Sequence, residues 1–281
     1  MSILYIVSTP IGNLDDTTHR AVTVLGAVSR VLAEDTRRTS ILFRRYGIHT
    51  PLVSAHEHNE AARAEQIVGW LDAGEDVALV SDAGTPLLSD PGARIVAAVV
   101  AAGHDVVPIP GASALLAALV GAAMAPEPFT FYGFLPRSGT ARAEVLEALA
   151  TLRHTAVLYE APTRLHALLV DLMAACGPDR PVAVARELTK LHETFFRGTL
   201  AEAADYYREG PVRGEIVVVL GGAAEVVASP EDAAALARTL LAAGESARSV
   251  AREVARRLQI PRNEAYSLVL SIAEEDATDE A

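Results

Sequence analysis

The stretch Val77-Ala78-Leu79-Val80-Ser81-Asp82-Ala83-Gly84-Thr85-Pro86 decides the fold prediction. Its first four residues are apolar, which is typical of a strand buried on both faces of a sheet. Small and polar residues follow at the carboxyl end of that strand, where open α/β sheets bind their ligands. Small residues there let the backbone approach a ligand closely. An ordinary tight turn would have the same composition, so this loop alone leaves both interpretations open.

Further apolar strands separated by helical segments surround this stretch. We expect strands at residues 3–7, 31–33, 51–53 and 106–109, and helices from about Thr18, over 60–73, and from Asp90-Pro91-Gly92 to Gly103. Alternating strands and helices indicate a parallel sheet covered on both faces. The sequence therefore predicts an N-terminal α/β domain over residues 1–112.

The remainder of the chain divides into two parts. Strand-like segments at 130–134, 155–159, 182–185 and 215–220, with helices at 140–152 and 162–175, predict a smaller α/β domain over 113–224 with mixed strand directions. Residues 225–281 are rich in alanine and arginine and carry no strand signal. A helix to Leu258, a turn at 259–261 and a helix from Asn263 predict a helix-turn-helix-like appendage. The last six residues are expected to be a frayed acidic tail.

Composition limits the classes of protein to consider. The 281 residues carry a formal net charge of -12, whereas a protein that coats nucleic acid is basic. Any nucleic-acid substrate must therefore be held by local basic patches. The single cysteine excludes a disulfide framework within the chain and fits a reducing compartment. No apolar run is long enough for a signal peptide or a membrane span, so we expect a cytoplasmic protein without a membrane partner.

Other local patterns argue for a pocket without phosphate or metal chemistry. The loop at residues 8–13 is neither a dinucleotide fingerprint nor a P-loop. His56 and His58 have no evident third ligand, so no metal is predicted. Pro110-Gly111-Ala112-Ser113 ends another strand and would lie at the same sheet edge as Ser81 to Pro86. Two such loops favour a pocket, although Ser113 could serve only as a helix N-cap.

These motifs occur together in one known family. Residues 7–14, 33–37, 81–92, 109–113, 131–136, 159–162 and 185–193 appear in the order found in that family. The chain resembles the ribosomal RNA small subunit methyltransferase I family of the tetrapyrrole-methylase superfamily, roughly over residues 3 to 222. The resemblance implies a class III methyltransferase fold with two α/β domains around S-adenosylmethionine. It also implies a homodimer that methylates a cytidine ribose 2′-hydroxyl in small-subunit (16S) ribosomal RNA.

The resemblance also implies which residues contact the cofactor. Those expected from the first domain and its following helix are Pro10, Asp82, Ala83, Gly84, Thr85, Leu88, Ser113 and Ala114. Those expected from the second domain are Tyr159, Leu188, Glu215 and Ile216.

A ribose hydroxyl is a weak nucleophile and benefits from a positioned base. The candidates, in falling order, are Lys190, Glu187 and Glu160. Lys190 is the only lysine in the chain, and it could act as a base only if burial or a neighbour such as Arg186 lowered its pKa.

Arginine clusters are the expected contacts with RNA phosphates. The candidates are Arg37, Arg38, Arg186, Arg248, Arg252 and Arg256, of which the last three recur every four residues along one helix face. A solvated face paired with Glu245 and Glu253 is an equally good interpretation of that stripe. Two other functions remain open at this point. One is a superfamily methylase acting on a tetrapyrrole or a protein side chain, and the other is a non-catalytic ribosome-assembly factor that binds RNA.

Overall fold

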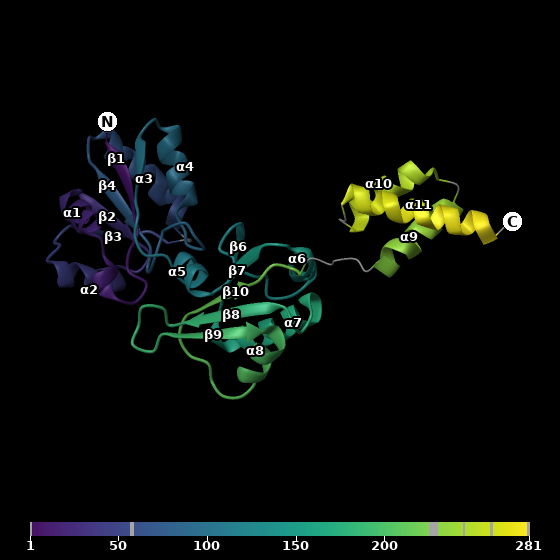
Figure 1. Cartoon of the computed structure of the whole chain (residues 1–281). Helices are drawn as coiled ribbons and strands as arrows, with labels where there is room; N and C mark the ends of the chain where they lie inside the picture. Colours follow the sequence, from purple (N-terminus) through teal and green to yellow (C-terminus); the bar gives the residue numbers. More distant parts are fainter. Residues whose placement is uncertain (1, 57–58, 225–229, 244, 259–260, 280–281) are drawn as a thin grey trace. The chain divides into compact units, whose positions relative to one another are not determined.

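The computed structural model describes residues 2–56, 59–224, 230–243, 245–258 and 261–279. The chain divides into two compact units, Met1–Ala223 and Ala224–Ala281. The first unit holds two separate five-stranded sheets, and the second contains helices (Figure 1). Among the described residues, no helix is long and apolar enough to cross a membrane.

The first sheet is parallel throughout, as predicted. Its strands are β1 (Ile3–Val7), β2 (Arg30–Ala33), β3 (Leu52–Ser54), β4 (Val77–Val80) and β5 (Asp105–Ile109), in the spatial order β3-β2-β4-β1-β5. In the register, Leu4 of β1 lies opposite Val77 of β4 and Val106 of β5. The carboxyl ends of β1, β4 and β5 therefore meet at one edge, which is where the loops of interest begin.

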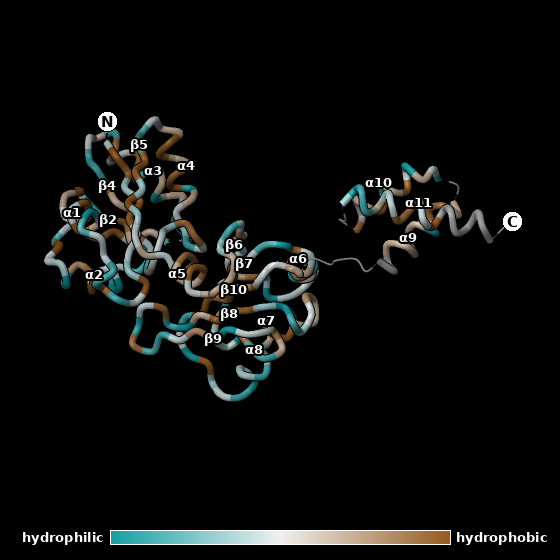
Figure 2. Tube along the Cα trace, viewed as in Figure 1, coloured by the Kyte–Doolittle hydropathy of each residue, from teal (hydrophilic) through white to brown (hydrophobic). Residues whose placement is uncertain are grey.

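Helices cover both faces of this sheet because the strand side chains alternate. Val31 and Val80 pack on the face of α1 (His19–Ala27) and α2 (Thr36–Tyr46). Leu32 and Leu79 pack on the face of α3 (Glu60–Asp72) and α4 (Ala93–Ala101). Each side is a separate hydrophobic core, and Figure 2 shows the apolar residues concentrated along the strands and the helix sides that meet them.

Two local features of this domain differ from the prediction. α2 was not predicted, because its arginines leave only a narrow apolar face at Thr39, Leu42 and Phe43. The helix after Pro91 begins at Ala93 rather than at Asp90, with Gly92 as its N-cap at a φ of 130°. The buried Glu60 carboxylate accepts the Gly92 and Arg94 N–H groups and so caps this helix.

The second sheet has mixed strand directions. Its order is β6 (Phe129–Phe134), β7 (Thr155–Glu160), β10 (Ile216–Leu220), β8 (Pro181–Arg186) and β9 (Thr194–Thr199). β6 is parallel to β7, and the other neighbours are antiparallel. The strand β9 was missed because its polar ends and Gly198 weaken the strand pattern.

Helices pack on both faces of this second sheet. α7 (Leu165–Cys176) and α8 (Leu200–Tyr206) contribute to the core on one face, and α6 (Thr140–Thr151) contributes Leu149. The short α8, capped by Thr199 and Glu202, was also missed. α5 (Ala114–Gly121) covers the other face, together with Ile11 from the loop after β1. The first domain's loop thus shares a core with the second sheet.

The second unit consists of α9 (Pro230–Ala242), α10 (Ala247–Leu258) and α11 (Arg262–Asp279). Alanines and short aliphatic residues form its core, with Ala237, Val250, Val254, Val269 and Ile272 at the centre. The predicted pair of helices around a turn is present, and residues 259–260 of that turn lie outside the described residues. The predicted frayed tail is wrong for residues 276–279, which continue α11. Residues 280–281 lie outside the described residues.

Candidate functional site

Three loops from the carboxyl edge of the first sheet are bonded to one another. Thr9 and Gly84 exchange two backbone hydrogen bonds of 2.9 and 3.0 Å. The Ser8 hydroxyl donates to the Thr85 hydroxyl at 3.2 Å, and the Thr85 hydroxyl donates to the Ala112 carbonyl at 3.3 Å. The loops after β1, β4 and β5 therefore form one continuous wall, as their shared sheet edge predicts.

Beside this wall lies a cavity of about 350 Å³. It is bounded by the first sheet's loops on one side and by the second sheet on the other. Its lining residues are Ile11, Ala83, Gly84, Thr85, Leu88, Ser89, Asp90, Ser113, Ala114, Phe134, Tyr159, Glu160, Ala161, Pro162, Leu188, Gly214, Glu215, Ile216 and Val217.

Ten of the predicted cofactor residues are in this lining, namely Ala83, Gly84, Thr85, Leu88, Ser113, Ala114, Tyr159, Leu188, Glu215 and Ile216. Ser113 also caps α5, so the N-cap interpretation and the pocket interpretation both hold for it. Pro10 and Asp82 are not in the lining, and their contact with the cofactor stays a prediction.

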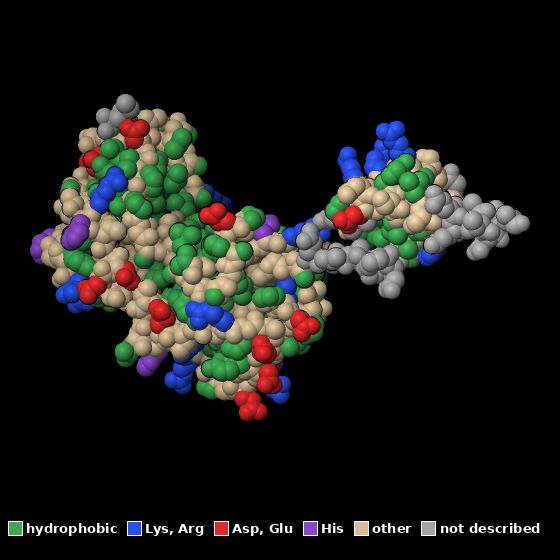
Figure 3. All heavy atoms as spheres, viewed as in Figure 1, with side chains coloured by type: hydrophobic (Ala, Val, Ile, Leu, Met, Phe, Trp, Pro, Cys, Tyr) green, Lys and Arg blue, Asp and Glu red, His purple; other side chains and the backbone are tan. Residues whose placement is uncertain are grey.

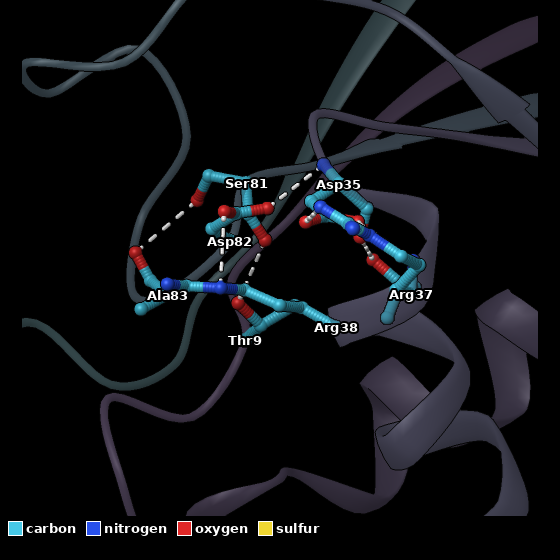
Figure 4. A network of polar contacts seen from close by, with 8 residues as sticks. Thr9, Asp35, Arg37, Arg38, Ser81, Asp82 and Ala83 are labelled. Carbon is cyan, nitrogen blue, oxygen red and sulfur yellow. Dashed lines mark hydrogen bonds and ion pairs between the residues drawn. The ribbon is translucent and has the colours of Figure 1, made fainter.

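Asp82 instead holds the first domain's loops together, as Figure 4 shows. Its carboxylate accepts the Asp35 N–H at 2.9 Å and pairs with Arg38 at 3.5 Å. Beside it, the Thr9 hydroxyl donates to the Ser81 carbonyl at 3.3 Å. The Arg37 guanidinium bonds the Asp35 carboxylate and lowers the pKa of that group to about 2. The network fixes the base of the wall rather than a ligand.

Two leucines of the lining, Leu88 and Leu188, are each flanked by residues with strained backbone conformations. Leu88 lies between Leu87 and Ser89, whose φ angles are 73° and 68°. Leu188 lies between Glu187 and Thr189, whose φ angles are 54° and 66°. The left-handed region costs a residue with a side chain about 1–2 kcal/mol, and such strain concentrates at functional sites. A lining leucine flanked by two residues of positive φ therefore occurs on both walls of the cavity.

An aromatic group stiffens the second-domain wall. The Tyr159 ring meets the rings of Phe131 and Phe134 edge-on, at centroid distances of 4.9 and 5.6 Å. Burial raises the pKa of the Tyr159 hydroxyl. The ring therefore contributes a flat, uncharged surface at neutral pH.

The predicted base Lys190 lies at the rim, outside the lining, and is engaged by two carboxylates. Its ammonium lies 2.8 Å from Glu187 and 3.1 Å from Glu215. Burial acts to lower the pKa of Lys190, but the hydrogen bonds to Glu187 and Glu215 outweigh it and raise that pKa. This direction is opposite to the lowered pKa that a lysine base requires, so the role of Lys190 stays a prediction that these contacts do not favour.

The two predicted carboxylate bases are also engaged. The Glu187 carboxylate, also outside the lining, accepts from Lys190 and from the Glu215 N–H at 2.9 Å, and the Lys190 hydrogen bond lowers its pKa. The Glu160 carboxylate is buried, accepts the Ala161 N–H at 2.7 Å and pairs with Arg164. Neither is a free base.

Sequence reasoning missed several residues that the fold brings to the cavity, including Ser89 and Asp90. Both belong to the family motif at residues 81–92, but neither was named as a site residue. Burial, followed by the negative charge of Glu34, raises the pKa of Asp90 to about 6. The signal that could have identified Asp90 was its place directly after the pocket loop. Among the described residues, no group of three or more His, Cys, Asp or Glu residues is arranged to hold a metal ion.

Comparison with known proteins places this site in a family. The family model described as Tetrapyrrole (Corrin/Porphyrin) Methylases matches residues 3–204. Ribosomal RNA small subunit methyltransferase I of Synechocystis is 44% identical over 280 residues, covering 97% of this chain and 99% of that protein. The chain belongs to the ribosomal RNA small subunit methyltransferase I family. The Bacillus subtilis member is 49% identical over 222 residues, covering 79% of this chain and 76% of its own length.

A solved structure supports the fold of this family. Uroporphyrin-III C-methyltransferase from Thermus thermophilus, complexed with S-adenyl homocysteine, matches with a TM-score of 0.58 and 19% identity. The match covers 79% of this chain and 97% of that one. At this identity the likeness shows the tetrapyrrole-methylase fold alone.

The predicted RNA contacts of this family member differ in their surroundings. Arg37 is paired with Asp35 and Arg38 with Asp82, so both arginines are partly neutralised. Arg186 donates to the Thr194 hydroxyl and to the Arg213 carbonyl, each at 3.2 Å. These bonds tie Arg186 to the second sheet's own edge.

The arginines of the second unit lie along a groove. Arg248 and Arg252 are exposed and line a groove between α10 and α11, together with Ser246, Ser249, Ala251, Arg262, Asn263 and Tyr266. Figure 3 shows basic side chains, which are all arginines in this unit, gathered over α10. The side chain of the third predicted arginine, Arg256, lies outside the described residues.

Proposed function

We propose that this chain transfers a methyl group from S-adenosylmethionine to the 2′-hydroxyl of a cytidine in small-subunit (16S) ribosomal RNA. The observation that carries the proposal is the cavity between the two sheets, in a chain whose family bears the name of a ribosomal RNA methyltransferase. We place the protein in the cytoplasm as a homodimer, with the small ribosomal subunit or its RNA as substrate.

The cavity suits S-adenosylmethionine in shape and chemistry. Ile11, Leu88, Leu188 and Val217 supply apolar surface for an adenine ring, and Thr85 and Ser113 supply hydroxyls beside it. Gly84, at a φ of 78°, allows the backbone to come close, because a Cβ there would lie 3.2 Å from Ile11 Cγ2. We propose the ten lining residues predicted from the sequence as the cofactor contacts.

The cofactor would supply a methyl group already activated by its sulfonium charge. The chain's own task is to hold donor and acceptor in line, which can provide most of the acceleration. The strained loops around Leu88 and Leu188 fix both walls before any ligand binds. The enclosing aromatic wall at Tyr159 limits water around the reacting atoms.

RNA binding is assigned to two arginine surfaces. The groove of the second unit combines exposed guanidinium groups with Asn263 and with Tyr266, on which a base could stack. Arg37 and Arg38 would reach phosphates only by exchanging their present carboxylate partners. We therefore assign the larger share of phosphate contacts to Arg248, Arg252 and Arg262.

The direct test is methyl transfer from labelled S-adenosylmethionine. Purified protein is offered small ribosomal subunits, naked 16S RNA or uroporphyrinogen, and the methylated nucleotide is mapped. Label in a ribose 2′-position of the RNA supports the proposal. Label in the tetrapyrrole, or no transfer despite cofactor binding by calorimetry, would contradict it in favour of the other functions.

A matched pair of variants ties the activity to the cavity. Ala114→Trp places an indole in the cavity and should abolish both cofactor binding and transfer. Ala101→Trp adds the same group at the exposed end of α4 and should leave both near the wild-type level. Equal activity of the two variants would remove the cavity from the mechanism.

A further inference from the structure

The ionisable groups that line the cavity differ in their ion-pair and hydrogen-bond partners. Those in the lining are Asp90, Tyr159, Glu160 and Glu215. A 2′-hydroxyl must lose its proton as its oxygen takes the methyl group, so a group that can accept a proton is needed near the acceptor. Lys190 is excluded, because its ammonium stays protonated between Glu187 and Glu215.

Three of the four lining groups are unsuited to this task. Tyr159 remains a neutral phenol at physiological pH, because burial raises its pKa. The Glu160 side chain is 1% exposed and is neutralised by Arg164 and the Ala161 N–H. Glu215 is 64% exposed and paired with Lys190 at 3.1 Å. Both carboxylates are therefore already paired with a basic side chain.

Asp90 has a different environment. It is half-buried, and the charged groups that act on its pKa are the carboxylates Glu34, after β2, and Asp82, after β4. Among the described residues, no basic side chain forms an ion pair with Asp90, and the Ser81 hydroxyl is the neighbour that acts to lower its pKa. From the second sheet, Tyr159 of β7 faces it. This setting raises the pKa of Asp90 to about 6, so it is ionised at pH 7 and yet more basic than an ordinary carboxylate.

The basic residues near this group act on Glu34. Burial and then Asp82 raise the pKa of Glu34, and the charge of Arg38 of α2, together with His56, after β3, acts to lower it. Of the described residues, no basic one is among the causes of the raised Asp90 pKa. The pH response of Asp90 depends on Glu34 and Asp82 as well as on its own burial.

The chain places Asp90 at the meeting of the two walls. Its loop begins at the cofactor wall with Ser81 and ends against the second sheet. There, a Cβ on Gly133 of β6 would lie 2.9 Å from the Ser89 hydroxyl, so the loop packs directly on that strand. Asp90 is thus a lining residue where both domains bound the cavity.

We propose that Asp90 is the catalytic residue that accepts the proton of the ribose 2′-hydroxyl during methyl transfer. The inference rests on the proposed function. As the O–H bond breaks, its electron pair forms the new O–CH₃ bond and the proton passes to an Asp90 carboxylate oxygen. The S–CH₃ bond breaks with its electrons going to sulfur, which leaves S-adenosylhomocysteine. Asp90 then releases the proton to solvent.

The test compares Asp90→Asn with Asp105→Asn, a matched change at an exposed aspartate at the start of β5. Single-turnover methylation of RNA and calorimetric titration with S-adenosylmethionine are measured for both variants and for the wild type. We expect Asp90→Asn to lose about 100-fold or more in rate, with cofactor Kd within about threefold of wild type. Asp105→Asn should match the wild type in both measurements.

The pH profile separates a base from a structural residue. The wild-type rate should rise with pH to a plateau above about pH 6, because Asp90 must be ionised to accept the proton. This rise should be absent from the residual rate of Asp90→Asn. A wild-type rate in Asp90→Asn, or a loss explained by weaker cofactor binding, would overturn the role of Asp90. Absence of transfer to RNA by the wild type would overturn the proposed function, and this role with it.

Discussion

Replacing Gly214 with alanine tests whether the hydrogen bonds of the Glu187 side chain stabilise the folded state at the rim of the cavity. Gly214 has a φ of 95°, and a Cβ built there would overlap the Glu187 side chain. Glu187 would have to leave its hydrogen bonds to Lys190, at 2.8 Å, and to the Glu215 N–H, at 2.9 Å. The substitution thus combines backbone strain with loss of a local ionic network.

The two contributions can be estimated and separated. Alanine at this φ costs about 1–2 kcal/mol. A hydrogen bond to a charged group contributes about 1.5–3 kcal/mol when fully buried. The Glu187 and Lys190 side chains are 20% and 26% exposed, so water replaces part of each bond. With about 1 kcal/mol for each lost bond, Gly214→Ala should lower the free energy of unfolding by about 3–4 kcal/mol.

Gly210→Ala is the matched control. Gly210 has a φ of 91°, and nothing lies within 4 Å of the Cβ position. Its substitution therefore carries the backbone strain alone, about 1–2 kcal/mol. Urea unfolding followed by circular dichroism should show a difference of about 2 kcal/mol between the variants, read from the midpoints at equal slopes. Equal losses would refute the reasoning, because Glu187 would then be free to move without cost.

Four other changes have expected outcomes. Buried Arg180 donates to the carbonyls of Gly221 at 2.6 Å and Leu152 at 2.8 Å, so Arg180→Ala should lower the free energy of unfolding by about 3–5 kcal/mol; a urea-midpoint loss below 1 kcal/mol would contradict this. Folding raises the pKa of Asp90 from 3.8 to about 6, so ionised Asp90 destabilises the folded state increasingly as pH rises from about 4 to 6. Asparagine cannot ionise, so after allowance for partial exposure Asp90→Asn should be about 1 kcal/mol more stable than wild type at pH 7. Thermal unfolding should show the two proteins equally stable below about pH 4. Lys190→Met should reduce the single-turnover rate less than about tenfold, since Lys190 is not the base, and abolition of transfer with normal cofactor binding would restore the lysine mechanism. Replacing Arg248, Arg252 and Arg262 by alanine should lower the slope of log K against log salt for RNA binding by about 2. The control set is the same replacement at exposed Arg20, Arg94 and Arg208. An unchanged slope in the first variant would show that the groove does not bind RNA phosphates.

The division of the chain between units bears on these measurements. The helices after Ala223 form their own compact unit with a core of small residues. Unfolding of the whole chain can therefore show more than one transition. The stability changes at Gly214, Asp90 and Arg180 all belong to the first unit and should appear in the same transition.

The sequence by itself determined the parallel first sheet and the mixed second sheet. Strands such as residues 77–80 are apolar at every position, and only burial on both faces explains that pattern. It also determined the small-residue loops at the end of that sheet, since parallel strands bring their carboxyl ends together. Ten of the twelve cofactor residues that the family resemblance implied are in the cavity lining, and Ala83, Gly84 and Thr85 among them come from the loop after β4.

The tertiary structure alone decided which ionisable groups are free to act. Lys190 stood out in the sequence as the only lysine, but its protonation depends on Glu215, which lies 25 positions away along the chain and 3.1 Å away in space. Asp90 was missed because its basicity arises from burial and from Glu34, a residue on another strand end. Local sequence specifies backbone conformation, whereas a pKa depends on charges and burial that only the packed chain assembles.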